Sequence, residues 1–244
     1  MTPVEKVLST ARAELGYLEK ASKAQLDSKT ANAGDKNWTK YARDLDALGV
    51  YDGPKNGYAW CAVFVFWCLV RAFGLETALK MTGQKLGGYG AGCTELVNYY
   101  RTVGRFYKSG PQPGDQIFFT KDGGKTFYHT GLVERVQGGM VYTIEGNTSS
   151  AAGVVENGGA VRDKSYSLTY SRIGGYGRPD YSLIKEEDDM VYYKTLNDVP
   201  SWYKPSVQKA VSKGALSGTG NGEINVSEDL CRTLTILDRL GKLD

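Results

Sequence analysis

Apolar residues recur at helical spacing near the start of the chain, over Val4–Leu18. Thr2 and Glu5 have the spacing of a capping box, and Pro3 suits the first position of a helix. The next stretch, residues 31–57, is polar with a few aromatic side chains. The pattern predicts a first helix from Pro3, which either ends at Gly16 or continues through it, followed by a short helix and a loop.

Residues 61–73 are apolar on every face and are followed by Gly74. The valines and phenylalanines would also suit a strand. A length of about 13 residues and the glycine stop instead favour a helix. Because a helix that is apolar all round must be covered on every side, we predict a buried central helix here.

From Pro111 onward the apolar residues alternate with polar ones, which is typical of strands. Glycine turns separate these segments, and Gln137–Gly139 is interpreted as a hairpin loop of three residues. The predicted strands are Gln116–Thr120, His129–Val136, Met140–Thr148, Val154–Glu156, Ser167–Tyr170 and Gly177–Tyr181. Close antiparallel strands after helices predict an α+β fold, with N-terminal helices packed on an antiparallel sheet.

An acidic run, Lys185–Asp189, interrupts this pattern and marks the expected domain boundary. Beyond it, residues 205–212 have a helical pattern, and Ser227 is placed to cap a second helix. A tail of about 55 residues buries only a marginal core. The expected organisation is a domain over residues 1–182, an acidic linker over 183–190 and a small helical module over 191–244.

Composition and charge exclude several classes of protein. The chain has 30 basic and 27 acidic residues, a balance that does not indicate binding to nucleic acid. It has no apolar run of about 18 residues that would insert into a membrane. Its start does not have the pattern of a secretory signal, so the four cysteines are expected to be reduced.

His129 is the only histidine in the chain. A hydrolytic zinc site usually takes at least two histidines, whereas a cysteine–histidine pair needs one as general base. Cys61 follows an Asn-Gly turn at the start of the predicted buried helix, and a helix N-terminus lowers the pKa of a thiol. The remaining cysteines are predicted to be small core residues: Cys68, Cys93 and Cys231.

Glu145 and Asn147 alternate onto one face of the strand that pairs with the histidine strand. With a three-residue loop, His129 lies opposite Asn147 and diagonal to Glu145, whose carboxylate would stabilise the imidazolium. A two-residue loop would shift the register by one and turn Glu145 away. Each residue alone is more simply structural, but the thiol, the histidine and the carboxylate together predict a catalytic site.

These segments resemble the CHAP family, the cysteine- and histidine-dependent amidohydrolases and peptidases of bacterial and phage cell-wall hydrolysis. The matching stretches, in the family's order over about residues 1–182, are Gly16–Glu19, Tyr58–Trp67, Pro113–Asp115, His129–Glu134, Glu145–Asn147 and Gly175–Arg178. The resemblance implies a papain-like fold with Cys61 as nucleophile, His129 as base and Glu145 orienting it. It also implies that Asn147 orients the histidine or polarises the site, and that the backbone N–H of Cys61 forms part of an oxyanion hole.

Some members of the family bind calcium through carboxylates just before the cysteine. Here Asp44, Asp46 and Asp52 precede it without a D-x-D-x-D loop, so no metal is expected. Acyl transfer through a thiol also needs no organic cofactor. The candidates for a glycopeptide groove, each of which could instead belong to the core, are Tyr58, Trp60, Tyr128 and Tyr142.

The tail resembles one S-layer homology unit over Asn197–Tyr203 and Lys213–Gly218. The usual Thr-Arg-Ala-Glu segment is absent, and Ser227–Leu230 stands in its approximate place. Two roles are therefore open for the tail: binding to a cell-wall polymer, or docking that includes formation of a homodimer.

Together these features predict an endolysin-like peptidoglycan hydrolase that cleaves an amide bond through a thioester on Cys61. The bond is either the N-acetylmuramoyl–L-alanine amide or a peptide bond of the stem or cross-bridge. The alternatives are a papain-like peptidase or acyltransferase acting on protein, and a non-catalytic wall-binding protein. Without a secretory signal, the protein is expected in the host cytoplasm until it is released to the cell wall.

Overall fold

The computed structural model describes residues 1–184, 191–218 and 220–243. The chain forms two compact units, Met1–Ile184 and Lys185–Asp244. Most of the expected acidic linker, residues 185–190, lies outside the described residues. Each unit is therefore described by itself.

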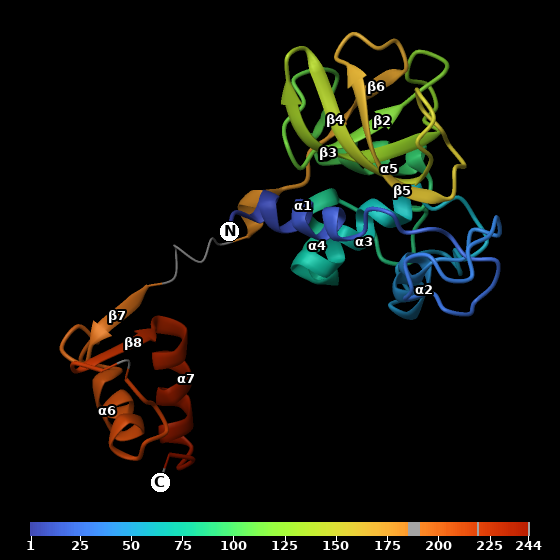
Figure 1. Ribbon diagram of the computed structural model, residues 1–244. Coiled ribbons are helices and arrows are strands. Elements are labelled where there is room, and N and C mark those ends of the chain that lie inside the picture. Colours follow the sequence, from blue (N-terminus) through green and yellow to red (C-terminus); the bar gives the residue numbers. More distant parts are fainter. Residues whose placement is uncertain (185–190, 219, 244) are drawn as a thin grey trace. The chain divides into compact units, whose positions relative to one another are not determined.

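The first unit combines helices with an antiparallel sheet, which confirms the predicted α+β fold (Figure 1). Its elements are α1 (Pro3–Ala13), α2 (Lys40–Ala47), α3 (Cys61–Phe73), α4 (Leu75–Thr82), α5 (Cys93–Thr102), β1 (Phe106–Tyr107), β2 (Gln116–Phe119), β3 (His129–Gln137), β4 (Met140–Thr148), β5 (Ala160–Ser167), β6 (Ile173–Gly177) and the 3₁₀ helix η1 (Tyr181–Leu183). The six strands form one sheet in the order β1-β6-β2-β3-β4-β5.

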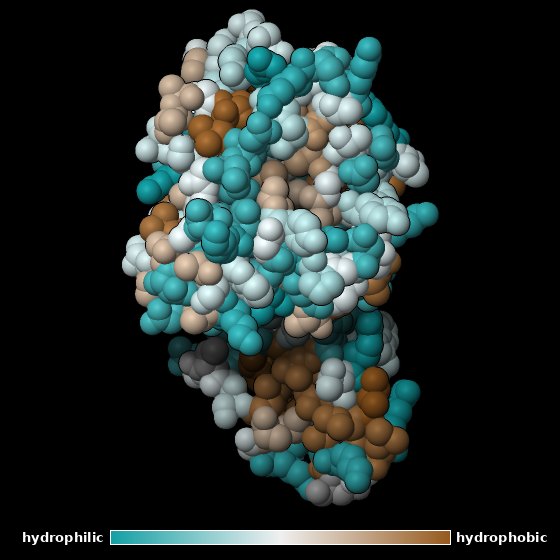
Figure 2. Space-filling model, turned by 90° about the vertical axis from the view of Figure 1, so that its right-hand side faces the viewer, coloured by the Kyte–Doolittle hydropathy of each residue, from teal (hydrophilic) through white to brown (hydrophobic). Residues whose placement is uncertain are grey.

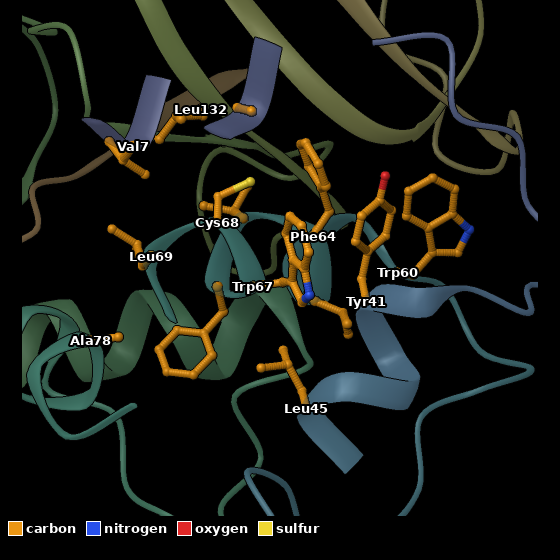
Figure 3. Close-up of a cluster of buried hydrophobic side chains, with 14 of the residues drawn as sticks. Val7, Tyr41, Leu45, Trp60, Phe64, Trp67, Cys68, Leu69, Ala78 and Leu132 are labelled. Atoms are coloured by element: carbon orange, nitrogen blue, oxygen red, sulfur yellow. The ribbon is translucent and has the colours of Figure 1, made fainter. Parts of the chain in front are cut away.

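Helix α3 lies in the core, as its apolar sequence requires. All its residues from Cys61 to Leu69 are buried. The helix packs against α1, α2 and α4 and against strands β3 and β4 of the sheet. In Figure 3, Phe64 and Leu69 extend from α3 among side chains of the neighbouring elements. Burial on all sides fixes the helix, and its first residue, Cys61, is fixed with it.

The first helix begins as predicted but ends earlier. The hydroxyl of Thr2 accepts a hydrogen bond from the backbone N–H of Glu5 at 3.2 Å, so Thr2 caps the helix. The Glu5 carboxylate accepts from Arg12 at 2.7 Å, in place of the backbone contact that a complete capping box would make. The helix stops at Ala13, and the apolar residues that follow it pack from a turn rather than from a helix.

The strands nearest the predicted hairpin are confirmed, and the later ones are displaced. Residues 154–156 form no strand, and the fifth strand is Ala160–Ser167, so residues 168–170 are a turn. The sixth strand is Ile173–Gly177, four residues before the predicted start. The fifth strand lies at the edge of the sheet, where charged residues are tolerated. Because it contains an Arg-Asp-Lys sequence, a search for apolar residues did not find it.

One ion pair joins two of the stretches that resemble the CHAP family, Pro113–Asp115 and Gly175–Arg178. The guanidinium of Arg178 donates two hydrogen bonds to the buried carboxylate of Asp115, both at 2.8 Å. It also donates to the backbone carbonyl of Gly110 at 2.9 Å. A bidentate pair of this kind is directional as well as charge-assisted, so it ties the end of the sixth strand to the turn before the second.

The C-terminal unit corrects the prediction of a purely helical module. It contains β7 (Tyr192–Thr195), α6 (Lys204–Ser212), β8 (Glu223–Ser227) and α7 (Glu228–Arg239), and the two strands pair antiparallel. Both predicted helices are present, and the Ser227 hydroxyl accepts from the N–H of Leu230 at 3.2 Å. Its small core consists of Val199, Val207, Ala210, Val226, Cys231 and Leu234.

Candidate active site

Cys61 is the first residue of α3, as predicted, and its side chain is 4% exposed. The residue before it, Trp60, provides no side-chain cap, so no cap competes for the N–H groups of the first turn. Trp60 is itself held, because its indole N–H donates to the buried carboxylate of Glu19 at 2.9 Å. The chain therefore enters α3 from a fixed direction, with the thiol beside open N–H groups.

His129 is the first residue of β3, and its imidazole is completely buried. Its Nε2 lies 3.0 Å from Oε2 of Glu145 on β4. The same oxygen accepts from the Tyr166 hydroxyl at 3.2 Å, and the other carboxylate oxygen accepts from Thr143 at 2.6 Å. The predicted partnership of His129 and Glu145 is thus present, within a larger buried network.

The register that brings these two residues together arises differently from the prediction. The hairpin loop has two residues, Gly138 and Gly139, because Gln137 pairs with Met140. This is the loop length that was expected to turn Glu145 away. A β-bulge between Val133 and Arg135 inserts one residue and shifts the register back, so that Leu132 pairs with Ile144.

Gly131 gives the Glu145 side chain its path to the histidine. A Cβ atom at Gly131 would overlap Cγ of Glu145 and would lie 3.2 Å from the carbonyl oxygen of Ile144. The carboxylate therefore crosses the neighbouring strand where that strand has no side chain. From there it reaches His129, two residues along the same strand.

The two candidate catalytic groups shift each other's pKa in opposite directions. For His129, burial alone would lower the pKa, but the charge of Cys61 and the contacts with Glu145 outweigh it and raise the pKa to about 10. For Cys61, the hydrogen bond with Cys93 and the charge of His129 outweigh burial and lower the pKa well below the usual value. Both shifts favour the charged forms of the pair, the thiolate of Cys61 and the imidazolium of His129.

The imidazole keeps one nitrogen for proton transfer. Because Nε2 is occupied by Glu145, Nδ1 is the nitrogen left for the thiol, and it makes no hydrogen bond within the described residues. A histidine held at one nitrogen by a carboxylate can give and take a proton at the other. The arrangement suits acyl transfer, in which a thiolate attacks a carbonyl carbon.

Asn147 does not bond to His129 in this structure. Its Oδ1 accepts from the backbone N–H of Gly159 at 3.3 Å, and its buried Nδ2 has no partner among the described residues. The residue has a φ of 55° beside a second irregularity of β4, between Glu145 and Thr148. The side chain therefore supports the neighbouring loop rather than the imidazole.

The four aromatic candidates have different surroundings. Tyr58 is 65% exposed and lines a groove of about 610 Å³. Trp60 is completely buried, so the structure corrects its assignment to a groove. Tyr128 is half-buried beneath the ammonium group of Lys121.

Tyr142 is placed away from the catalytic pair, which is a second correction. It pairs with Arg135 near the closed end of the hairpin, and the guanidinium lies 3.6 Å from the centre of its ring. His129 and Glu145 lie toward the other end of the same two strands. The alternating pattern tells only which face of a strand a side chain lies on. It does not tell how far along the strand that side chain lies from the site.

The groove that contains Tyr58 opens where α3 and α5 begin. Its lining includes Ala59, two residues before Cys61, and Gly92, the residue before Cys93. Its other lining residues are Asp52, Lys55, Tyr89, Ala91 and Glu95. A hollow of similar volume, 620 Å³, lies beside α2, and neither hollow is lined by Cys61 or His129.

Sequence reasoning missed three residues of the site: Cys93, Thr143 and Tyr166. Thr143 was within reach, because it lies two residues before Glu145 on the same face of a strand. Tyr166 belongs to the fifth strand, which was predicted at the wrong residues. Cys93 begins a helix that was not predicted. Neither carries a local signal for its position.

The part of the chain that the structure describes contains no group of three or more metal-binding side chains. Asp52 pairs with Lys55, and Asp46 accepts from the backbone N–H of Lys55. Within the same described ranges, every helix is too short or too polar to cross a membrane.

Comparisons with known proteins match the central part of the first unit. Residues 53–147 match the model of the CHAP domain, and this segment contains Cys61, His129, Glu145 and Asn147. A comparison with curated proteins returned no match.

Two solved structures are similar to the chain. One is the crystal structure of Ly7917, with 15% identity and a TM-score of 0.44, over 80% of this chain and 66% of that one. The other is Ly7917 with the hydrolyzing product of MDP, with 14% identity and a TM-score of 0.42, over 78% of this chain and 65% of that one. The chain thus spans slightly less than two thirds of the length of either structure.

We expect His129 to stay protonated at neutral pH and to lose its proton near pH 10. Because it is the only histidine, its ring signals in an NMR titration need no assignment. In Cys61→Ala the thiolate that stabilises the imidazolium is gone, so the pKa falls. A wild-type titration near 6.5, the ordinary value, would contradict the ion pair.

We expect Gly131→Ala to lower the pKa of His129 by about 1–2 units, because the new methyl group displaces Glu145 and removes a charge-assisted hydrogen bond. The same NMR titration measures the shift. The matched control is Gly53→Ala, since a Cβ at Gly53 meets no atom within 4 Å. An unchanged pKa in Gly131→Ala would show that the carboxylate does not depend on this path.

Proposed function

We propose that the first unit is a cysteine-dependent amidohydrolase of bacterial cell-wall peptidoglycan. The observation that carries the proposal is the buried contact of 3.0 Å between Nε2 of His129 and Oε2 of Glu145, together with a buried Cys61 whose pKa is lowered by the hydrogen bond with Cys93 and by the charge of His129. The match of residues 53–147 to the CHAP domain supports the reaction class and the substrate class of this proposal. We also propose that the protein acts as a phage endolysin does.

The residues perform the reaction in two halves. The Cys61 thiolate attacks the carbonyl carbon of an amide, and the imidazolium of His129 gives its proton to the leaving amine. A thioester remains on Cys61. His129 then takes a proton from water, which attacks the thioester and releases the acid and the thiolate.

The charge that develops on the carbonyl oxygen needs N–H donors. The first turn of α3 has no side-chain cap, so the backbone N–H of Cys61 is a donor for that oxygen. Glu145 does not exchange a proton in this scheme. Its carboxylate holds the imidazole ring and stabilises its charge in both halves.

The groove at the starts of α3 and α5 supports a substrate that carries peptide and sugar. Two exposed tyrosines, Tyr58 and Tyr89, offer flat faces on which sugar rings and peptide groups can lie, and Glu95 adds a carboxylate. The proposed bond is the N-acetylmuramoyl–L-alanine amide or a peptide bond of the stem or cross-bridge. The rival activity, on protein substrates, would use the same catalytic residues.

We expect Cys61→Ala and His129→Ala each to lower the release of free amines from purified Gram-positive cell walls by at least about 10³-fold, because both roles are chemical. Mass spectrometry of the digest identifies the new ends. A new N-terminal L-alanine indicates the amidase, and any other N-terminal residue indicates an endopeptidase.

The matched control for these variants is Cys68→Ala, which removes a buried thiol from the same helix and leaves activity close to that of the wild type. New reducing sugars would indicate a glycosidase and contradict the mechanism. Release from protein substrates but not from walls of several cross-bridge types would favour the peptidase or acyltransferase.

For the C-terminal unit we propose attachment to the cell wall. Large apolar side chains are exposed on this small body, among them Trp202 at 67% and Leu240 at 65%. Figure 2 shows apolar residues gathered on one of its faces. An exposed apolar surface on a unit with its own core supports a role in binding rather than in catalysis.

We expect a chain ending at Ile184 to lose most of its binding to whole cell walls while its rate on small soluble muropeptides stays within about twofold. The first unit is compact without the tail, so its active site remains assembled. Co-sedimentation with walls measures binding, and amine release measures the rate. Equal losses in both assays would make the tail part of the catalytic fold.

A further inference from the structure

The nucleophile has a second sulfur beside it. Sγ of Cys93 lies 3.8 Å from Sγ of Cys61, within hydrogen-bond range for two sulfur atoms. Both thiols are buried, at 7% and 4% exposure. They come from two different helices, and each is the first residue of its helix.

The two helix starts share a further feature. Trp60 precedes α3 and Gly92 precedes α5, and neither offers a side-chain cap. Hydroxyl groups cap the first, second and seventh helices, whereas α4 and α6 also lack a side-chain cap. The N-terminus of a helix carries a partial positive charge. Both α3 and α5 therefore place this charge at the pair of sulfur atoms, and no capping oxygen lies between.

The surroundings of the two sulfurs decide which one carries the negative charge. Cys61 lies beside the imidazolium of His129, which favours the thiolate there. The contact with Cys61 raises the pKa of Cys93, and burial and the nearby carboxylate of Glu95 add to this shift. Cys93 is thus the protonated partner, and its S–H is the donor.

We propose that Cys93 is a positioning residue for the nucleophile: its S–H donates a hydrogen bond to the thiolate of Cys61 and holds it in the charged form. This inference rests on the proposed role of Cys61. The hydrogen bond forms without proton transfer, so Cys93 stays a thiol through the reaction. It acts twice, first by keeping Cys61 ionised before attack and later by stabilising the thiolate that leaves when water opens the thioester.

The test is the pH dependence of alkylation of Cys61 by iodoacetamide, followed on the Cys61 peptide by mass spectrometry. The whole chain is used, freshly freed of reductant so that both sulfurs remain thiols. We expect Cys93→Ala to raise the pKa of Cys61 by about one unit, with a tenfold lower rate at acidic pH and the same limiting rate at high pH.

Three variants separate the hydrogen bond from packing. Cys93→Ser keeps a donor and is expected to restore most of the low pKa. Cys93→Val fills the space without a donor and is expected to behave like Cys93→Ala. Cys68→Ala removes a thiol from α3 away from the pair and is expected to change nothing.

The outcomes distinguish this inference from the function on which it rests. A low pKa of Cys61 in the wild type that persists in Cys93→Ala or Cys93→Val overturns the role of Cys93 alone. An ordinary pKa of Cys61 near 8.5 in the wild type overturns the activated nucleophile, and with it the proposed function.

Discussion

The buried carboxylate of Glu145 is the constraint on which the rest of the site depends. A carboxylate without exposed surface is costly unless donors surround it. His129, Tyr166 and Thr143 provide those donors from three adjacent strands. The contacts from His129 and Tyr166 cross between strands and require those strands to hold one register, so the contacts that stabilise the sheet also orient the imidazole.

That register depends on a compensation that no local pattern reveals. A two-residue turn through Gly138 and Gly139 would by itself place the histidine and the carboxylate on opposite faces. The bulge around Glu134 adds one residue to β3 and returns them to the same face. The side chain of Glu134 accepts from Arg12 of the first helix at 2.7 Å, so the bulged strand is also tied to a helix.

The predictions from sequence succeeded where a pattern was long or a residue was unique. The buried helix, the strands on both sides of the hairpin and the contact between His129 and Glu145 followed from apolar spacing and from a single histidine. The prediction of the contact was right although the assumed loop length was wrong. The error in the loop and the unforeseen bulge cancelled.

The predictions failed where tertiary position overrides local sequence. An edge strand with the charges of Arg162, Asp163 and Lys164 does not look apolar, because one of its sides pairs with no other strand. Cys93 looks like any buried thiol in sequence, and only the meeting of two helices places it against Cys61. Local patterns carry no information about such meetings.

Several groups act against the burial of the Cys61 thiolate, first the hydrogen bond with Cys93 and then the charge of His129. In this fold they arrive from separate elements: the imidazolium from β3, a thiol from α5 and open N–H groups from α3 itself. Rigid burial of α3 keeps these groups fixed before any substrate binds. In the proposed function the core therefore preorganises the site, and a substrate has only to reach the groove at the two helix starts.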